Sequence, residues 1–278
     1  MFIFKSKKKL QKHLSALENG KKIGFVPTMG ALHEGHLHLI EQSNLKCDIS
    51  ICSIFVNPTQ FNNTTDLANY PDTLTNDLEM LQEKRCDIVY TPPVNDLYEK
   101  GELAKSYDFG SLATYLEGEF RPGHFNGMAT VIEKLLKIIN PTIAFFGQKD
   151  LQQLYIVKAL VKQMQSDTHI EGVATVREES GLAKSSRNKL LSESAKEEAC
   201  LIYNCLNYCK KNKAKGVAKL KLHIQNNFLK HENFTLEYAD IVSINTMLPI
   251  KDWGGVDKNA ICISAYHSGV RLIDNIIL

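Results

Sequence analysis

The feature that most constrains how this chain can fold is an alternation of short apolar runs with longer stretches of helical periodicity. The apolar runs are continuous instead of alternating with polar residues, which is typical of strands buried on both faces. Between them, leucines recur three or four residues apart, as on one face of a helix. Strands that alternate with helices are joined by right-handed crossovers into a parallel sheet with helices on both faces. The sequence therefore predicts a doubly wound α/β fold.

The elements of this α/β region are expected within residues 1–176. Ser6 is a possible cap for the first helix, and Pro27 is expected to end the first long strand. Strands are predicted at residues 23–26, 49–56, 88–90, 142–146 and 170–176. Helices are predicted around Leu10, Leu14 and Leu17 and at residues 35–46, 74–81, 128–139 and 151–164.

The order of elements changes after residue 176, where two helices precede several strands. Ser194 and Glu197 form a possible capping box for a helix that ends at Cys209. A second helix is predicted at residues 215–229, followed by strands at residues 236–244, 260–265 and 270–273. Helices followed by strands are typical of an α+β unit. We expect two domains, residues 1–176 and residues 177–278.

Composition narrows the class of protein. The formal net charge of +2 over 278 residues is too small to indicate a polyanion-binding surface, so no nucleic-acid partner is expected. Neither a secretory signal nor an apolar run of membrane-spanning length is present, which predicts a cytoplasmic protein. The seven cysteines include no Cys-x-x-Cys pair. Cys205 and Cys209 fall on the apolar face of a predicted helix, which indicates core packing and not a metal or redox site.

The most informative segment is residues 27–36, between a predicted strand and a predicted helix. Parallel sheets bind ligands at the carboxyl ends of their strands, where a helix N-terminus offers backbone N–H groups to phosphate. Gly30 and Gly35 allow close backbone approach, and His33 and His36 can both face that phosphate. A P-loop would need Lys and Ser or Thr at the end of the segment, and a zinc-protease motif would need histidines four apart, so both readings fail. A turn with surface histidines is the plain alternative.

Three further segments occupy comparable positions. Residues 54–61 end the second strand with polar amides, although Asn-Pro is also common in simple turns. Residues 147–153 start a helix after a strand, where Asp150 could act only as a cap. Residues 181–188 place two hydroxyls between two cations, which suits phosphate oxygens but also suits a solvated linker. Together, the four segments indicate a nucleotide site.

These residues resemble a known family. A His-x-Gly-His segment followed by a Lys-x-Ser-Ser type of loop is similar to the class I nucleotidyltransferase pattern, and the full set resembles the pantothenate synthetases, or pantoate–beta-alanine ligases. The matching blocks span nearly the whole chain, and those at residues 27–36 and 146–153 are the most specific. The blocks lie at residues 27–36, 54–61, 121–125 (Arg-Pro-Gly-His-Phe), 146–153, 181–188 and 271–275 (Arg-Leu-Ile-Asp-Asn).

The resemblance implies a Rossmann-like N-terminal domain, a smaller C-terminal lid domain, a homodimer, and the substrates ATP, pantoate and beta-alanine. It places Gly147 and Asp150 on the ribose and the backbone of Val176 on adenine. Gln60 and Gln153 would hold pantoate, with Gln60 also near beta-alanine. The residues implied to contact ATP are Met29, Gly30, Ala31, Leu32, His33, Glu34, Gly35, His36, Gly147, Gln148, Lys149, Asp150, Val176, Lys184, Ser185, Ser186 and Arg187.

The resemblance also implies catalytic roles, most directly for His36, and then for His33, Lys149 and Arg187. These groups would supply positive charge as a carboxylate attacks ATP, with Mg²⁺ on the phosphates and its protein ligands left open. Three positions depart from the usual family pattern: Asp72, Ser180 and Lys184.

Two other functions fit parts of the pattern. A nucleotidyltransferase could move AMP onto a phosphate and stop there, but the neutral amides of Gln60 and Gln153 favour an acceptor with hydroxyls and one carboxylate. A non-catalytic nucleotide-binding or tRNA-related module is disfavoured by the near-neutral charge. Pyrophosphate exchange driven by a phosphorylated acceptor would indicate the first alternative, and ATP binding without any pyrophosphate release would indicate the second.

Overall fold

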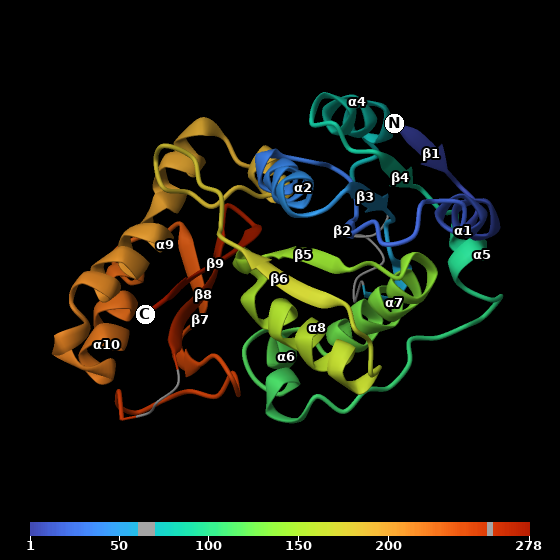
Figure 1. Cartoon of the computed structure of the whole chain (residues 1–278). Helices are drawn as coiled ribbons and strands as arrows, with labels where there is room; N and C mark the ends of the chain where they lie inside the picture. The colour runs from blue at the N-terminus through green and yellow to red at the C-terminus, as the bar shows by residue number, and fades with distance from the viewer. Residues whose placement is uncertain (61–69, 255–257) are drawn as a thin grey trace.

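A six-stranded parallel sheet forms the larger part of the protein (Figure 1). The computed structural model describes residues 1–60, 70–254 and 258–278. The strand order β1-β4-β3-β2-β5-β6 is that of a doubly wound sheet, so the predicted fold class is confirmed. The strands are β1 (Phe2–Phe4), β2 (Ile23–Thr28), β3 (Ile49–Ile54), β4 (Ile88–Tyr90), β5 (Ile143–Gly147) and β6 (His169–Val173).

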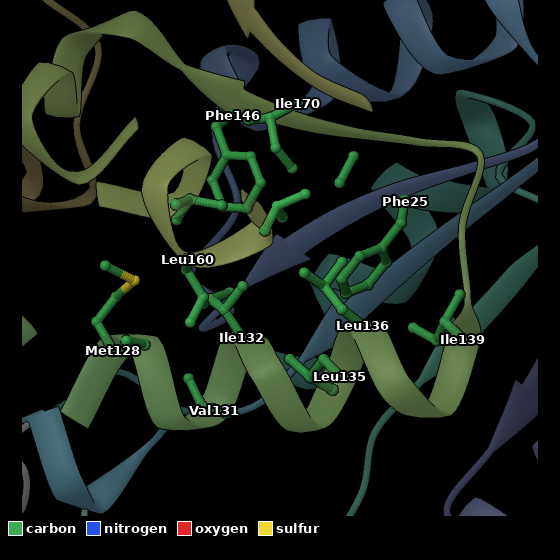
Figure 2. Close-up of a cluster of buried hydrophobic side chains, with 14 of the residues drawn as sticks. Phe25, Met128, Val131, Ile132, Leu135, Leu136, Ile139, Phe146, Leu160 and Ile170 are labelled. Atoms are coloured by element: carbon green, nitrogen blue, oxygen red, sulfur yellow. The ribbon is translucent and has the colours of Figure 1, made fainter. Parts of the chain in front are cut away.

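Helices cover both faces of this sheet because the strand residues alternate between two apolar clusters. Phe25 and Phe146 face α7 and α8 in the larger cluster (Figure 2). Val26 and Phe145 face α2 and α4 in the smaller one. The helices are α1 (Lys7–Leu14), α2 (Glu34–Lys46), α4 (Leu74–Glu83), α5 (Val94–Leu97), α6 (Glu117–Phe120), α7 (His124–Ile139) and α8 (Leu151–Gln163).

A three-stranded antiparallel sheet, in the order β7-β8-β9, makes up the C-terminal part. One face packs against two helices, and the other face contacts Leu116 and Leu151 of the larger part. The C-terminal sheet is therefore seated beside the start of α8. Its elements are α9 (Glu193–Lys211), α10 (Val217–Phe228), β7 (Phe234–Ser243), β8 (Asn259–His267) and β9 (Val270–Ile277).

The structure corrects several predicted boundaries. Pro27 does not end β2, which continues to Thr28. Pro27 lies beyond the last residue of β2 that pairs with β5, so its missing N–H costs no ladder bond on that side. The short edge strand β1, which pairs with β4, was not expected. Helix α7 begins a full turn before residue 128, at His124.

The predicted capping box at Ser194 is wrong. Helix α9 begins at Glu193, and its cap is Ser192, whose Oγ accepts a hydrogen bond from the Ala195 N–H at 3.2 Å. Ser194 already lies inside the first turn, two residues after the serine that caps the helix. The expected packing role of the cysteines is confirmed, since Cys205 and Cys209 are buried on the apolar face of α9.

Loops at the carboxyl ends of three neighbouring strands set up the site. Strand β2 pairs with both β3 and β5, and the winding direction of the chain reverses between β2 and β5. Such a reversal opens a crevice at the carboxyl edge of a parallel sheet.

Within the described residues, no helix is both long and apolar enough to span a bilayer.

Candidate active site

The loop after β2 turns sharply at Gly30 and Ala31, with φ angles of 85° and 50°. A Cβ atom at position 30 would lie 3.1 Å from Asp77 Oδ2 and 3.2 Å from Ile54 Cγ2. Glycine therefore meets both the backbone conformation and the lack of space here. The turn brings the chain directly into the first turn of α2, where His33 is the cap residue.

Asp77 of α4 holds this loop from behind. The backbone N–H groups of Ala31 and Leu32 donate to its two carboxylate oxygens at 3.0 and 2.9 Å. The Thr73 hydroxyl donates to the same carboxylate at 3.0 Å. Asp77 is only 1% exposed, so these hydrogen bonds satisfy a buried anion. The loop that carries the histidines is thereby fixed to a second helix.

The two histidines lie against each other, with ring centroids 4.0 Å apart. His33 Nδ1 accepts a hydrogen bond from the Gly35 N–H at 3.1 Å, so the neutral ring carries its proton on Nε2. His36 Nδ1 is buried and has no hydrogen-bond partner among the described residues. A buried polar atom of this kind favours a ligand or water that can pair with it.

Both imidazoles are neutral near pH 7. Burial lowers the pKa of His33 to about 4, with a further contribution from the charge of Lys149. Burial, followed by the neighbouring His33, lowers the pKa of His36 to about 3. In the free protein these rings are hydrogen-bonding groups, not the cations that sequence reasoning expected. Fixed positive charge has to come from lysine and arginine side chains such as Lys149 and Arg187.

Lys149 lies where two pockets adjoin, in the single 3₁₀ turn η3 (Gln148–Asp150) that follows β5. In the first pocket it faces Ser185 and Arg187 from the loop that leads into the 3₁₀ turn η4 (Ser186–Leu190). In the second pocket it adjoins Gln153 of α8. The structure thus brings together residues from the two segments at 147–153 and 181–188.

Gln60 lies next to the glycine turn, in the 3₁₀ turn η1 (Pro58–Gln60). Its side-chain amide contacts Met29 Sδ at 2.7 Å and accepts a hydrogen bond from Asn57 Nδ2 at 3.1 Å. Its backbone carbonyl lies 3.1 Å from Nδ1 of His124, which itself lines the pocket of Gln153. His124 therefore links Gln60 to the pocket that Gln153 lines. Phe61, the last residue of the same sequence block, lies outside the described residues.

Tyr70 contacts both the loop after β2, which carries His33, and the loop at residues 181–188. Its hydroxyl donates to the Gly30 carbonyl at 3.5 Å. Burial raises the pKa of Tyr70, while the charge of Arg187 and a hydrogen bond with Ser186 oppose that shift. The three contacts indicate that Ser186 and Arg187 lie close to the loop after β2.

Comparison with known proteins agrees with this arrangement. A family model described as pantoate-beta-alanine ligase matches residues 2–277. The chain belongs to the pantoate–beta-alanine ligase family. Among its relatives are the pantothenate synthetases of Azobacteroides pseudotrichonymphae genomovar. CFP2, 44% identical with 99% of both chains covered, and of Christiangramia forsetii, 41% identical with 100% and 99% covered.

Solved structures of the pantoate–beta-alanine ligase family share the whole fold. Pantothenate synthetase from Thermus thermophilus superposes with a TM-score of 0.92 at 36% identity, with 99% of each chain covered. The ligase from Francisella tularensis, solved in complex with beta-gamma ATP and beta-alanine, gives a TM-score of 0.83 at 37% identity, covering 100% of this chain and 97% of that one. The recognition drawn from the sequence is confirmed, and the chain is a ligase.

Lys184, one of the positions that depart from the usual family pattern, has two partners in this structure. The Lys184 ammonium lies 2.5 Å from the Glu34 carboxylate at the start of α2, and its backbone N–H donates to the Val176 carbonyl at 2.9 Å. The Lys184 charge is therefore paired before any ligand binds. The ion pair also ties the loop at 181–188 to the helix that His33 caps.

Sequence reasoning missed Asp77 and gave no role to Asn275. Asp77 could have been noticed, because it lies three residues after Leu74 and four before Leu81, on the apolar face of a helix. A carboxylate at such a position needs partners. Asn275 lies in a block recognised by resemblance, but its contacts join segments far apart in the chain and have no local signal.

Proposed function

We propose that the chain joins pantoate to beta-alanine with the use of ATP, through a pantoyl-adenylate intermediate, releasing pyrophosphate and then AMP. The observation that carries the proposal is the convergence of three chain segments at one edge of the sheet. Lys149 lines one pocket with Arg187 and the adjoining pocket with Gln153. The charge of Lys149 also contributes to the lowered pKa of both His33 and His36. The family name, and the ligands named for the Francisella tularensis relative, support the choice of substrates.

ATP would bind with its phosphates at the N-terminus of α2. The positive end of the helix dipole favours anions there, and Nε2–H of His33 would add a donor. Gly147 and Asp150 would hold the ribose, and the backbone at Val176 would meet adenine. Met29, Gly30, Ala31, Leu32, Glu34, Gly35, His36, Gln148, Lys184, Ser185 and Ser186 would complete the nucleotide site.

In the first step a pantoate carboxylate oxygen would attack the α-phosphorus of ATP. An O–P bond forms to the acid, the bond to the β-phosphate oxygen breaks, and pyrophosphate leaves with that electron pair. Because both reactants are anions, the barrier falls when positive charge and hydrogen-bond donors are already in place. Lys149 and Arg187 would supply charge, and His33 and His36 would act as donors. Each such group is worth about 3 kcal/mol in the transition state, or roughly a hundredfold in rate.

In the second step the amine of beta-alanine would attack the acyl carbon. A C–N bond forms, the bond from that carbon to the phosphate oxygen breaks, and AMP leaves with the electron pair. Gln60 and Gln153 would hold pantoate through its hydroxyls and carboxylate, and Gln60 would lie near the incoming amine. A closed loop at 181–188 would keep water from attacking first.

Mg²⁺ is expected to accompany ATP. Among the described residues, no group of three or more His, Cys, Asp or Glu side chains converges to form a cation cage. We therefore expect the ion to be held mainly by phosphate oxygens and water, as is usual for Mg²⁺ with nucleotides. When bound, the ion would neutralise charge on the phosphates.

Three broader properties belong to the same proposal. We place the domain boundary near residue 176, so that residues 1–176 bind ATP and pantoate and residues 177–278 form the lid. We expect a homodimer, which light scattering in solution would test. We expect the enzyme in the cytoplasm, where its small-molecule substrates would be available, with no nucleic-acid partner.

Pantoate-dependent exchange of labelled pyrophosphate into ATP tests the first step. Exchange should occur with pantoate and without beta-alanine. Exchange driven by a phosphorylated acceptor in place of pantoate would support the AMP-transferring alternative. ATP binding with no exchange under either condition would support the non-catalytic alternative.

A further inference from the structure

The turn that carries Lys149 has few anchors of its own. It is a single 3₁₀ turn between β5 and α8, and none of its three residues is buried. Neither Gly147 nor Asp150 supplies a side-chain cap to the adjoining helical turns. A turn of this kind keeps its backbone position only if something else in the protein holds it.

Asn275 of β9 provides that hold from the other sheet. Its Nδ2 donates to the carbonyl of Gln148 at 3.0 Å and to the carbonyl of Lys149 at 2.8 Å. The two carbonyls lie more than 120 residues away in sequence and are bridged by one amide nitrogen. Asn275 is only 4% exposed, so water competes little for these bonds.

The backbone of Asn275 is itself held by neighbouring residues. Its backbone N–H donates to Asp274 Oδ1 at 2.8 Å, and its strand position pairs with Cys262 of β8. Asp274 in turn accepts two hydrogen bonds from Arg177, at 2.5 and 2.9 Å. The amide nitrogen therefore projects from a rigid strand whose position is set independently of the Lys149 turn.

Asparagine is the residue best suited to bind the carbonyls of Gln148 and Lys149 from this position. Two carbonyl oxygens need two N–H donors, and an –NH₂ group supplies both from one atom. Asp would set a carboxylate oxygen against the two carbonyls, Ser would offer one donor, and Ala none. The amide orientation is also determined, because a reversed side chain would place Oδ1 against both carbonyls.

We propose that Asn275 is a positioning residue for adenylate formation, which acts by holding the Lys149 turn at the edge of the crevice. This inference rests on the proposed function, because it assumes that the Lys149 ammonium meets the phosphates. A displacement of about 1 Å in a charged group can cost on the order of a hundredfold in rate. The C-terminal sheet therefore sets the position of a cation that belongs to the N-terminal fold.

A double-mutant cycle in pantoate-dependent pyrophosphate exchange tests the inference. Asn275→Ala should lower the exchange rate by roughly 10- to 100-fold. In a Lys149→Ala background the same substitution should have almost no further effect, because the group being positioned is gone. Equal fold-losses in both backgrounds, or a wild-type rate in Asn275→Ala, would overturn it.

Asn259→Ala is the matched control. Asn259 is also a buried asparagine of the C-terminal sheet, at 7% exposure, and its hydrogen bond with Leu278 uses the backbone carbonyl that alanine keeps. Thermal unfolding of both variants measures any general loss of stability. A loss of exchange in Asn259→Ala as large as in Asn275→Ala would assign the effect to the sheet as a whole and contradict positioning.

An NMR titration of His33 gives a readout that needs no substrate. The charge of Lys149 contributes to the low pKa of His33, second to burial. Displacing the turn should therefore raise the pKa of His33 in Asn275→Ala, in the direction of its value in Lys149→Ala, while Asn259→Ala leaves it unchanged. An unchanged His33 pKa in Asn275→Ala would refute positioning. If wild-type exchange is absent while the pKa shift is present, the proposed function fails and the positioning stands.

Discussion

The substitution Asp77→Asn tests how the histidine loop is held. Asp77 accepts two backbone N–H groups and one hydroxyl at 2.9 to 3.0 Å, and is 1% exposed. An asparagine of the same shape keeps one acceptor oxygen and turns an –NH₂ group toward the other N–H. One charge-assisted bond is lost, at ~2 kcal/mol, and one buried N–H is left without an acceptor, at ~1–3 kcal/mol. We therefore expect a loss of about 3–5 kcal/mol in the free energy of unfolding.

The same substitution should reduce adenylate formation. Ala31 is held at a positive φ angle, and without the carboxylate the loop can relax and move the histidines. A shift of about 1 Å would lower pyrophosphate exchange on the order of a hundredfold. Urea unfolding and exchange measure the two effects, with Asp72→Asn as the exposed control on the same segment. Wild-type stability and exchange in Asp77→Asn would show that the carboxylate does not hold the loop.

The site and its histidines support four more predictions. His36→Ala should fold normally and lose most adenylate formation, by about a hundredfold in exchange; wild-type turnover would remove His36 from the mechanism. Gln153→Ala should weaken pantoate binding while ATP binding stays near normal, and an unchanged apparent affinity for the acid would contradict that role. Lys184→Met should weaken ATP binding if the cation serves the phosphates, and unaltered affinity and rate would show that its role is limited to surface pairing. Because burial lowers the folded-state pKa values of His33, His36 and His124 to about 4, 3 and 4, the unfolded chain binds protons first as pH falls. Stability should therefore decline from about pH 6.5 toward pH 4, and a flat denaturation midpoint between about pH 7 and 5 would contradict it.

The acid prediction depends on the sign of each shift. A histidine that stays neutral in the folded protein gives stability that is fully present above its unfolded pKa of about 6.5. Glu117 behaves differently: burial opposes its ionisation, but hydrogen bonds and charge from Arg271 outweigh burial and lower its pKa to about 2. Its contribution is present above about pH 4.5 and is lost only in stronger acid. Loss that begins near pH 6.5 therefore reports the histidines.

The alternation of strands and helices was predictable because each element carries its own periodicity. Strand β4 and helix α2 lie at or within one residue of their expected bounds. Elements that depend on a neighbour were not predictable. Strand β1 has three residues and exists because β4 offers it an edge, and β2 passes through Pro27 because β5 has already ended its pairing there.

The candidate site shows the same division. His33, Lys149 and the loop at 181–188 were found from sequence because each follows a strand or precedes a helix, where ligands of parallel sheets bind. The charge state of the histidines was not predictable, because it depends on burial and on Lys149 more than a hundred residues away in sequence. Asp77 and Asn275 support the site through contacts that only the folded chain creates.

The most direct test of the central claim is AMP release by the purified enzyme with ATP, Mg²⁺, pantoate and beta-alanine, each omitted in turn. We predict that AMP and pantothenate form in equal amounts only when all the components are present. Steady AMP release that needs neither pantoate nor beta-alanine, or no release with the complete mixture, would contradict the claim.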